Sequence, residues 1–174
     1  HEHGIRKALN FGHTVGHALE EFSMQQPGGA VVSARLLPLA RARTAPTKQE
    51  AQKGGAVVST APTKPTNQTP TGALLHGYAV AFGLIGELYI SARKAGFPTA
   101  RLHQTARFIR ENYGAAAFTC DDYPTLLNLM RHDKKNTADT INFTLLHDIG
   151  DIRINQTATD EEIREALDFI REGY

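Results

Sequence analysis

Residues 4–21 read GIRKALNFGHTVGHALEE, and this stretch predicts an amphipathic helix from about Gly4 to Phe22. Four polar side chains recur in it at helical spacing: Arg6, Asn10, His13 and His17. At about 100° per residue they fall within roughly 60° of one helix face. The opposite face can pack against a core, because it carries Ile5, Leu9, Gly12, Gly16 and Leu19. A guanidinium, an amide and two imidazoles in one line predict the wall of an active site.

The rest of the chain outside residues 25–72 is also mostly helical in pattern. Further helices are predicted over about 76–95, 99–113 and 122–132, and glycines at the ends of the first two (Gly96 and Gly114) are typical C-terminal signals. A last helix follows the capping box that Thr159 and Glu162 form.

One short segment has the period of a strand. Ile141, Phe143 and Leu145 alternate with polar residues, and Ile152 and Ile154 follow after a turn. This pattern predicts a β-hairpin. The expected fold class is therefore mainly α, a helical domain with one small β-hairpin.

Residues 25–72 have a different composition from the rest of the chain. They are rich in Thr, Pro, Ala, Gln and Gly, and GGAVVS at 28–33 recurs at 54–59. Six of the 48 residues are basic and only Glu50 is acidic, so the segment carries a net charge of +5 and the remainder −4. We interpret it as a low-complexity, disordered insert in a surface loop. The alternative is a segment that binds a partner.

Composition excludes several function classes. The basic residues gather in the insert, so nucleic-acid binding gains no support. No apolar run is long enough to cross a membrane, and the N-terminus does not resemble a signal peptide. The lone Cys120 suits a reducing compartment, which predicts a cytoplasmic protein. Because the chain starts at His1 without Met, we expect it to begin inside a longer gene product.

His13 and His17 lie four residues apart, which is a spacing of metal ligands on a helix. No Glu follows the first His, so the metalloprotease helix signature is absent, and ordinary surface or core histidines remain the alternative. If the insert loops out, His76 becomes a third imidazole beside them. Three protein ligands suit a catalytic divalent cation such as zinc, and two histidines with one oxygen ligand also suffice.

Asp133-Lys134-Lys135-Asn136 closes the helix predicted over 122–132. The lysines are either a solvated helix end or a phosphate clamp. Glycine-rich phosphate loops of the dinucleotide or Walker type do not occur in the chain. If the protein uses a dinucleotide, we therefore expect the domain that binds it to lie outside this chain.

In combination, these motifs resemble the C-terminal domain of 3-dehydroquinate synthase. The resemblance rests on the order and spacing of the motifs. It covers nearly the whole chain except residues 25–72. The motifs are EHGIR at 2–6, NFGHT at 10–14, GHA at 16–18, HG at 76–77, DKK at 133–135 and the strand at 141–146. It implies a carbon–oxygen lyase that uses NAD and a divalent metal, zinc or cobalt. That family converts 3-deoxy-arabino-heptulosonate 7-phosphate into 3-dehydroquinate in the second step of the shikimate pathway, which leads to chorismate and the aromatic amino acids.

The resemblance also implies a role for each matching residue. His13 and His76 would be metal ligands, with a glutamate upstream as the third. Arg6, Asn10 and His17 would contact the sugar-phosphate substrate, and His17 would relay protons near the departing phosphate. A lysine of the DKK motif would bind that phosphate, either Lys134, which we favour, or Lys135.

Residues 1–174 would thus form the C-terminal helical metal and substrate domain, and the N-terminal NAD-binding domain would be absent. We expect the chain alone to be inactive and a homodimer to be the oligomer, as is common in the family. Tyr78 departs from the family pattern, which has Glu after His-Gly, and predicts only a local change in packing or hydrogen bonding. The alternatives are another sugar-phosphate cyclase, a metal-dependent polyol dehydrogenase, or a non-catalytic helical interaction module.

Overall fold

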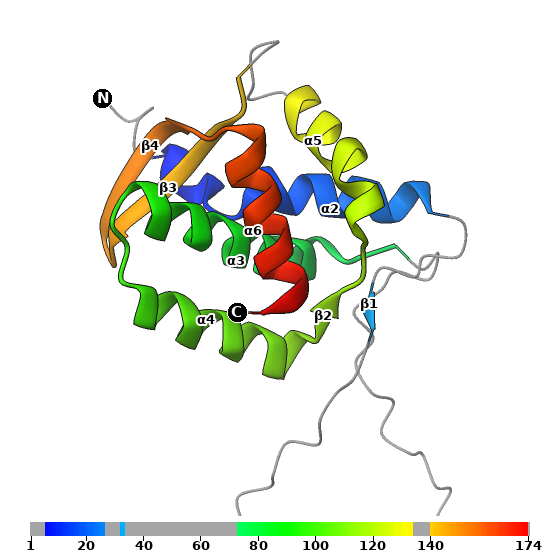
Figure 1. Ribbon diagram of the computed structural model, residues 1–174, viewed down its shortest axis with the longest axis horizontal. Helices are drawn as coiled ribbons and strands as arrows, with labels where there is room; N and C mark the ends of the chain where they lie inside the picture. Colours follow the sequence, from blue (N-terminus) through cyan, green and yellow to red (C-terminus); the bar gives the residue numbers. More distant parts are fainter. Residues whose placement is uncertain (1–5, 27–31, 34–72, 134–139, 174) are drawn as a thin grey trace, which may run out of the picture.

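The computed structural model describes residues 6–26, 32–33, 73–133 and 140–173 (Figure 1). Within these ranges the chain is mainly helical and has one β-hairpin, as predicted. The elements in chain order are η1 (Lys7–Asn10), α2 (His13–Gln25), β1 (Val32–Ser33), α3 (His76–Lys94), α4 (Thr99–Tyr113), β2 (Ala115–Ala116), η2 (Cys120–Asp122), α5 (Tyr123–His132), β3 (Asn142–Asp148), β4 (Asp151–Thr157) and α6 (Asp160–Glu172).

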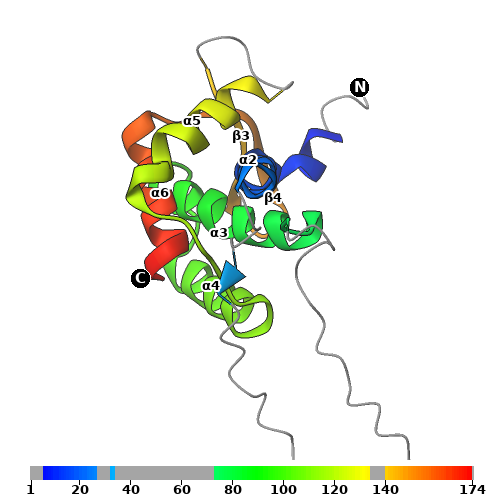
Figure 2. The ribbon, with the colours of Figure 1, turned by 90° about the vertical axis from the view of Figure 1, so that its right-hand side faces the viewer.

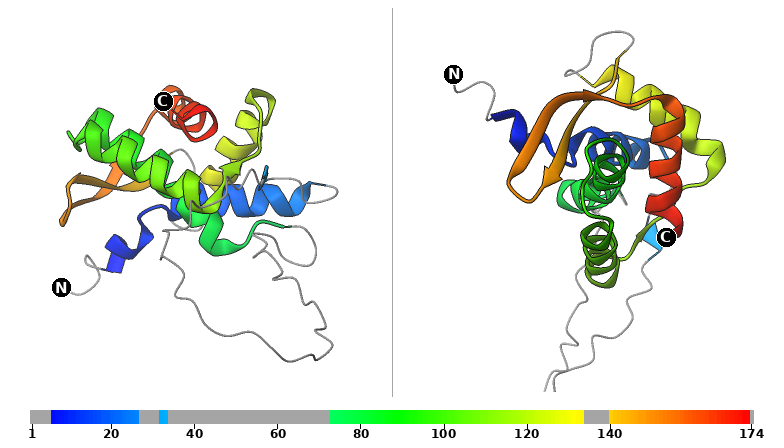
Figure 3. Two further views of the ribbon diagram at one scale, coloured as in Figure 1. Left: turned by 90° about the horizontal axis from the view of Figure 1, so that it is seen from below. Right: turned by 60° about the vertical axis from the view of Figure 1, so that its left-hand side comes forward.

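Helix α3 is the central element of the fold. It contacts α2, α4, α6 and β3. Figure 2 looks along α2, with α3 passing beneath it and α5 above, and Figure 3 shows α6 beside α3. Most of its residues from Ala79 to Ser91 are buried, which is expected of a helix that is apolar nearly all round.

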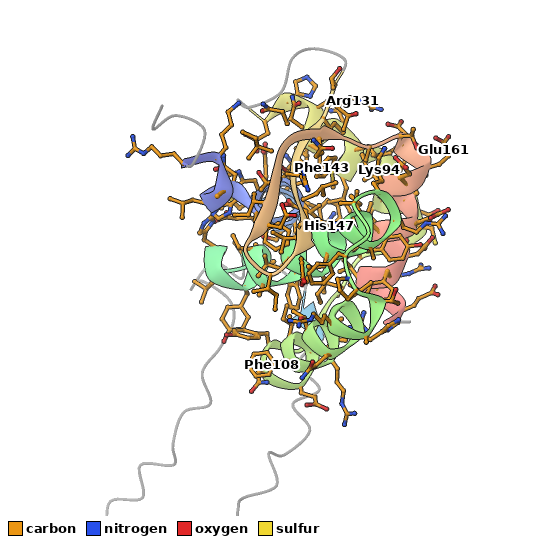
Figure 4. All side chains as sticks on the ribbon, turned by 90° about the vertical axis from the view of Figure 1, so that its left-hand side faces the viewer. Lys94, Phe108, Arg131, Phe143, His147 and Glu161 are labelled. Atoms are coloured by element: carbon orange, nitrogen blue, oxygen red, sulfur yellow. The ribbon has the colours of Figure 1, made fainter. Side chains whose placement is uncertain are left out.

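The core lies where α2, α4, α6 and β3 pack on α3, and α5 adds to it through its contacts with α2 and α6. Its fully buried large side chains come from α2, α3, α5, β3 and α6: Leu19, Phe82, Ile85, Leu126, Leu127, Met130, Phe143, Leu145, Ile163 and Leu167. Figure 4 shows Phe143 inside the molecule and Phe108 on the outer side of α4, where it is 59% exposed.

The hairpin joins β3 and β4 in antiparallel register, with Phe143 opposite Gln156 and Leu145 opposite Arg153. Gly150 turns the chain with a φ of 86°, a value that favours glycine. The inner strand β3 is attached to the central helix, since the Leu146 N–H donates to Ser91 Oγ at 3.0 Å. The hairpin therefore covers one side of α3.

Helix α6 begins with the capping box read from the sequence. Thr159 Oγ1 accepts from the Glu162 N–H at 3.2 Å, and Glu162 Oε2 accepts from the Thr159 N–H at 2.8 Å. Burial alone would raise the pKa of Glu162, but the hydrogen bonds from Thr159 and Lys94 outweigh it and lower that pKa. Arg131 at the end of α5 pairs with Asp160, so Figure 4 shows Arg131 and Glu161 at the same end of the molecule.

The prediction of one helix from Gly4 to Phe22 is wrong within the described residues. A 3-10 helix covers Lys7–Asn10, the chain turns at Phe11, and α2 starts at His13. Gly12 takes a φ of 81° and a Cβ there would lie 2.8 Å from the Leu84 side chain. The turn also leaves Leu9, expected on the packed face, 75% exposed. The polar stripe of the sequence is thus split at residue 11.

A second strand pairing was not predicted. Val32 and Ser33 of β1 pair antiparallel with Ala116 and Ala115 of β2. These two residues belong to the segment interpreted as a disordered insert, so that interpretation does not hold for them. Residues 27–31 and 34–72 lie outside the described part of the chain.

None of the helices in the described residues is both long enough and apolar enough to span a membrane.

Candidate metal and substrate site

Three histidines from two helices meet at one point. His13 is the first residue of α2, His17 follows one turn later, and His76 is the first residue of α3. Their ring centroids are 5.4 Å (13 to 17), 5.5 Å (13 to 76) and 5.6 Å (17 to 76) apart. One ligand nitrogen from each ring lies within 4.8 Å of the other two. The cluster therefore brings His13 and His17, which precede residues 27–72 in the chain, together with His76, which follows them.

The chain returns to α2 before α3 begins. The Leu74 N–H donates to Ser23 Oγ at 2.9 Å across 51 residues of sequence. This contact places Leu74 beside the last turns of α2. The expectation that His76 lies beside His13 and His17 is confirmed.

Each ring of the cluster directs Nδ1 at an oxygen atom. The partners are the Phe11 carbonyl for His13 (3.2 Å), Asp133 Oδ2 for His17 (3.1 Å) and Glu20 Oε2 for His76 (2.8 Å). A carbonyl or an ionised carboxylate can only accept, so Nδ1 must carry the proton in each ring. The neutral tautomer then has its lone pair on Nε2. Such contacts orient histidine ligands in metal sites.

The donor set suits a divalent transition metal. Neutral imidazole is a common ligand of zinc and cobalt-type ions, at about 2.0–2.1 Å from the metal. Tetrahedral geometry would hold two such nitrogens about 3.4 Å apart. The ligand atoms of the three rings lie within 4.8 Å of one another, which is somewhat wider than that spacing. Carboxylates of Glu20 and Asp133 close to the rings add negative charge, which favours a cation.

A groove of about 570 Å³ opens beside His17, between α2 and α5. It is lined by His17, Ala18, Glu20, Glu21, Met24, Leu129, His132 and Asp133. Because His17 belongs both to the cluster and to this lining, a molecule in the groove would lie against the cluster.

The two lysines expected to bind phosphate, Lys134 and Lys135, lie outside the described residues. Asp133 precedes them directly, and it lines the groove and contacts His17. Of the three rings, His17 is therefore the one tied to the residue next to the lysines.

Arg6 and Asn10 are not on the helix that carries the histidines. Arg6 is exposed just before η1, and Asn10 ends η1. Asn10 lines a second cavity of about 160 Å³ together with Lys7, Thr14, Asn142, Phe143, Thr144 and Asn155. The structure thus separates these two residues from the groove beside His17, whereas the sequence pattern put all four on one face.

Several residues of the site were missed by the sequence analysis. Glu20 follows His17 by three residues, a spacing that puts it near the same helix face, and Asp133 adjoins the lysines. Glu87 interrupts an otherwise apolar helix, and it is fully buried. A charge in such a run is a signal that the sequence offered.

Tyr78, the departure from the family pattern, packs toward α4. Its ring meets the ring of Tyr113 edge-on, with centroids 5.3 Å apart. The expected local change relative to the family pattern stays a prediction.

The fold and the cluster define a class of protein: a helical module in which the first turns of two helices bring histidines together as a candidate metal site beside an open groove. Comparison with known proteins names the family. The model of the 3-dehydroquinate synthase C-terminal family matches residues 1–56 and 66–136, and the chain belongs to that family.

Curated relatives agree with this assignment. A 3-dehydroquinate synthase of Parabacteroides distasonis is 42% identical over 173 residues, covering 99% of this chain and 36% of the relative. The enzyme of Geobacillus kaustophilus is 27% identical, and the match covers 99% of this chain and 34% of that relative. The enzyme of Salinibacter ruber is also 27% identical, and the match covers 97% of this chain and 33% of that relative. The chain spans about a third of the length of the relatives it matches.

Proposed function

We propose that this chain supplies the metal-binding side, and part of the substrate-binding side, of a 3-dehydroquinate synthase active site. The reaction would be the elimination of phosphate from 3-deoxy-arabino-heptulosonate 7-phosphate and its cyclisation to 3-dehydroquinate, in the shikimate pathway. The observation that carries the proposal is the cluster of His13, His17 and His76, whose ligand nitrogens lie within 4.8 Å of one another. The names of the curated relatives favour this reaction over that of another sugar-phosphate cyclase or a polyol dehydrogenase.

In this proposal His13 and His76 hold the divalent cation, zinc or cobalt, through Nε2. The contacts of their Nδ1 atoms with Phe11 and Glu20 support that choice of nitrogen. We place the remaining ligand, a glutamate, in the region of the relatives that this chain does not cover. The NAD-binding domain would lie in the same region. When bound, the cation would polarise substrate hydroxyl oxygens, and NAD would supply the acceptor and donor of a hydride.

His17 has a separate role on the substrate side. Asp133 holds its Nδ1–H, so Nε2 is the atom that exchanges a proton with the departing phosphate. Lys134, with Lys135 as the alternative, binds that phosphate next to Asp133. Arg6 and Asn10 would contact a part of the substrate that extends beyond the groove, since Asn10 lines the second cavity and neither residue lines the groove.

A titration of the chain with Co²⁺, followed by visible absorption, tests the metal site. We expect His13→Ala and His76→Ala each to weaken Co²⁺ binding by more than about 100-fold, because each removes a ligand. His103→Ala is the matched control, since His103 is an exposed histidine of α4 and lies outside the cluster. Stoichiometric Co²⁺ binding by the double variant His13→Ala/His76→Ala would refute the site.

A chimera tests the reaction. This chain would replace the matching third of the Parabacteroides distasonis protein, and inorganic phosphate released from the heptulosonate phosphate would be measured with NAD and Co²⁺ present. We expect phosphate release that His17→Ala abolishes, and Lys134→Ala should reduce it more than Lys135→Ala. A chimera that binds Co²⁺ yet releases no phosphate would contradict the proposed reaction.

A cytoplasmic location and a homodimer belong to the same proposal. Cell fractionation and analytical ultracentrifugation test them.

A further inference from the structure

Glu87 is a fully buried carboxylate in the middle of the central helix. Its relative exposure is 0%, and its neighbours on either side, Gly86 and Leu88, are buried too. An ionised side chain is rarely buried unless hydrogen bonds or another charge compensate the loss of water. The contacts of Glu87 therefore indicate what keeps it there.

The compensation comes from the backbone of the helix that carries His13. Glu87 Oε2 accepts from the Gly12 N–H at 2.7 Å, and Oε1 accepts from the N–H groups of Thr14 at 3.0 Å and Val15 at 3.4 Å. Gly12 is the N-cap of α2 and has no side chain to cap it. Glu87 thus binds N–H groups on both sides of His13. They belong to the first turn of α2, whose N–H groups have no acceptor within the helix.

Glycines keep the two helices close enough for this contact. A Cβ built on Gly83, one turn before Glu87, would overlap the Gly12 carbonyl oxygen and lie 2.6 Å from the Gly16 nitrogen. The backbones of α2 and α3 therefore touch. Since His76 begins α3 and His13 begins α2, this crossing sets the position of one proposed ligand relative to the other.

The charge of Glu87 matters as well as its hydrogen bonds. The N-terminus of a helix carries a partial positive charge, equivalent to roughly half an elementary charge. His13 is the first residue of α2, so a cation bound to it would lie near this charge and be repelled. A carboxylate on the first-turn N–H groups offsets that repulsion.

We propose that Glu87 is a positioning residue for the metal site. It fixes the first turn of α2, and with it His13, and it offsets the positive end of that helix. This inference rests on the proposed function, because it takes His13 as a metal ligand.

The variant Glu87→Gln tests the inference in the 174-residue chain. A glutamine keeps the shape and one acceptor oxygen, but it removes the charge and places an NH₂ group where Gly12 or Thr14 donates. We expect a folded protein, by circular dichroism, whose Kd for Co²⁺ rises by about 10- to 100-fold. The visible spectrum of bound Co²⁺ should also change, because the His13 ring is displaced, and a loss of stability alone would leave that spectrum unaltered.

Glu165→Gln is the matched control. Glu165 lies on α6 and bonds to Tyr89 and Arg93, away from the cluster. Its variant should bind Co²⁺ as the parent does. If the parent chain binds no Co²⁺, the proposed site and this inference both fail. If the parent binds Co²⁺ and Glu87→Gln binds it with unchanged Kd and spectrum, the inference alone is overturned.

Hydrogen exchange on the parent chain decides the question if Glu87→Gln does not fold. Metal binding and Glu87 act on the same turn, so Zn²⁺ should slow exchange of the Gly12 and Thr14 amide protons by about 10-fold or more. Equal exchange rates with and without bound Zn²⁺ would overturn the inference.

Discussion

Helices α2 and α6 begin in two different ways. Helix α6 is capped by its own sequence, through the reciprocal hydrogen bonds of Thr159 and Glu162. Helix α2 starts at a glycine without a side-chain cap, and its first N–H groups are bound by Glu87, which lies 75 residues from Gly12. The start of α6 can form locally, whereas the start of α2 needs α3 in place. The proposed metal ligands therefore depend on the tertiary structure that surrounds them.

The largest effect is expected where the two helix backbones touch. Gly83→Ala places a methyl group on the backbone of α2, and such overpacking costs about 3 kcal/mol in the free energy of unfolding. Gly77→Ala is the control in the same helix, because a Cβ there meets nothing within 4 Å. Urea unfolding measures both. A Gly83→Ala variant as stable as the parent would show that the crossing does not fix α2.

The carboxylate that orients His76 should have the next largest effect. Glu20→Gln removes the charged acceptor of the His76 ring, and we expect Co²⁺ affinity to fall by about 10-fold. Glu21→Gln is matched to it, since Glu21 is adjacent and lines the same groove. Equal losses in the two variants would mean that only the charge of the groove matters and that orientation of the ring does not.

The local cap of α6 gives a smaller effect, on stability only. Thr159→Ala removes an N-cap side chain and should cost about 1 kcal/mol in the free energy of unfolding. Co²⁺ affinity should remain that of the parent, because this cap is local to α6. A weakened metal site in this variant would contradict the separation of the two helix starts.

The smallest expected effect is the pH dependence of the same cap. The pKa of Glu162 is lowered from its ordinary value of 4.5 in the folded protein, so its contribution to stability is present above that value and is lost as the pH falls below it. Unfolding at pH 6 and pH 3 should therefore show a steeper loss for the parent than for Glu162→Gln. We expect a difference of roughly 0.5 kcal/mol, and equal slopes would contradict the assigned shift.

The same contrast explains what the sequence could predict. The bounds of α3, α4 and α5, the start of α6 and the presence of the hairpin followed from local signals, such as glycines after helices, a capping box and alternating apolar residues. The break before α2 could not be predicted in this way, because polar residues recur at helical spacing on both sides of Gly12. The turn depends instead on the fit of Gly12 against Leu84. Periodicity cannot detect a contact made by a distant element.

For the site, the sequence identified the three histidines because their side chains form a recognisable pattern. It did not separate Asn10 from the groove beside His17, because that separation follows from the same turn at residue 11. Glu87 was missed because its role depends on the crossing of α2 and α3. The pairing of β1 with β2 depends on a return of the chain that no local signal marks.

Anomalous X-ray diffraction from crystals of the chain loaded with Co²⁺ tests the central claim most directly. The account predicts one ion bound by Nε2 of His13 and Nε2 of His76, with the His17 ring held by Asp133 on the side of the groove. An ion bound away from these two rings, or bound through Nδ1, would contradict it.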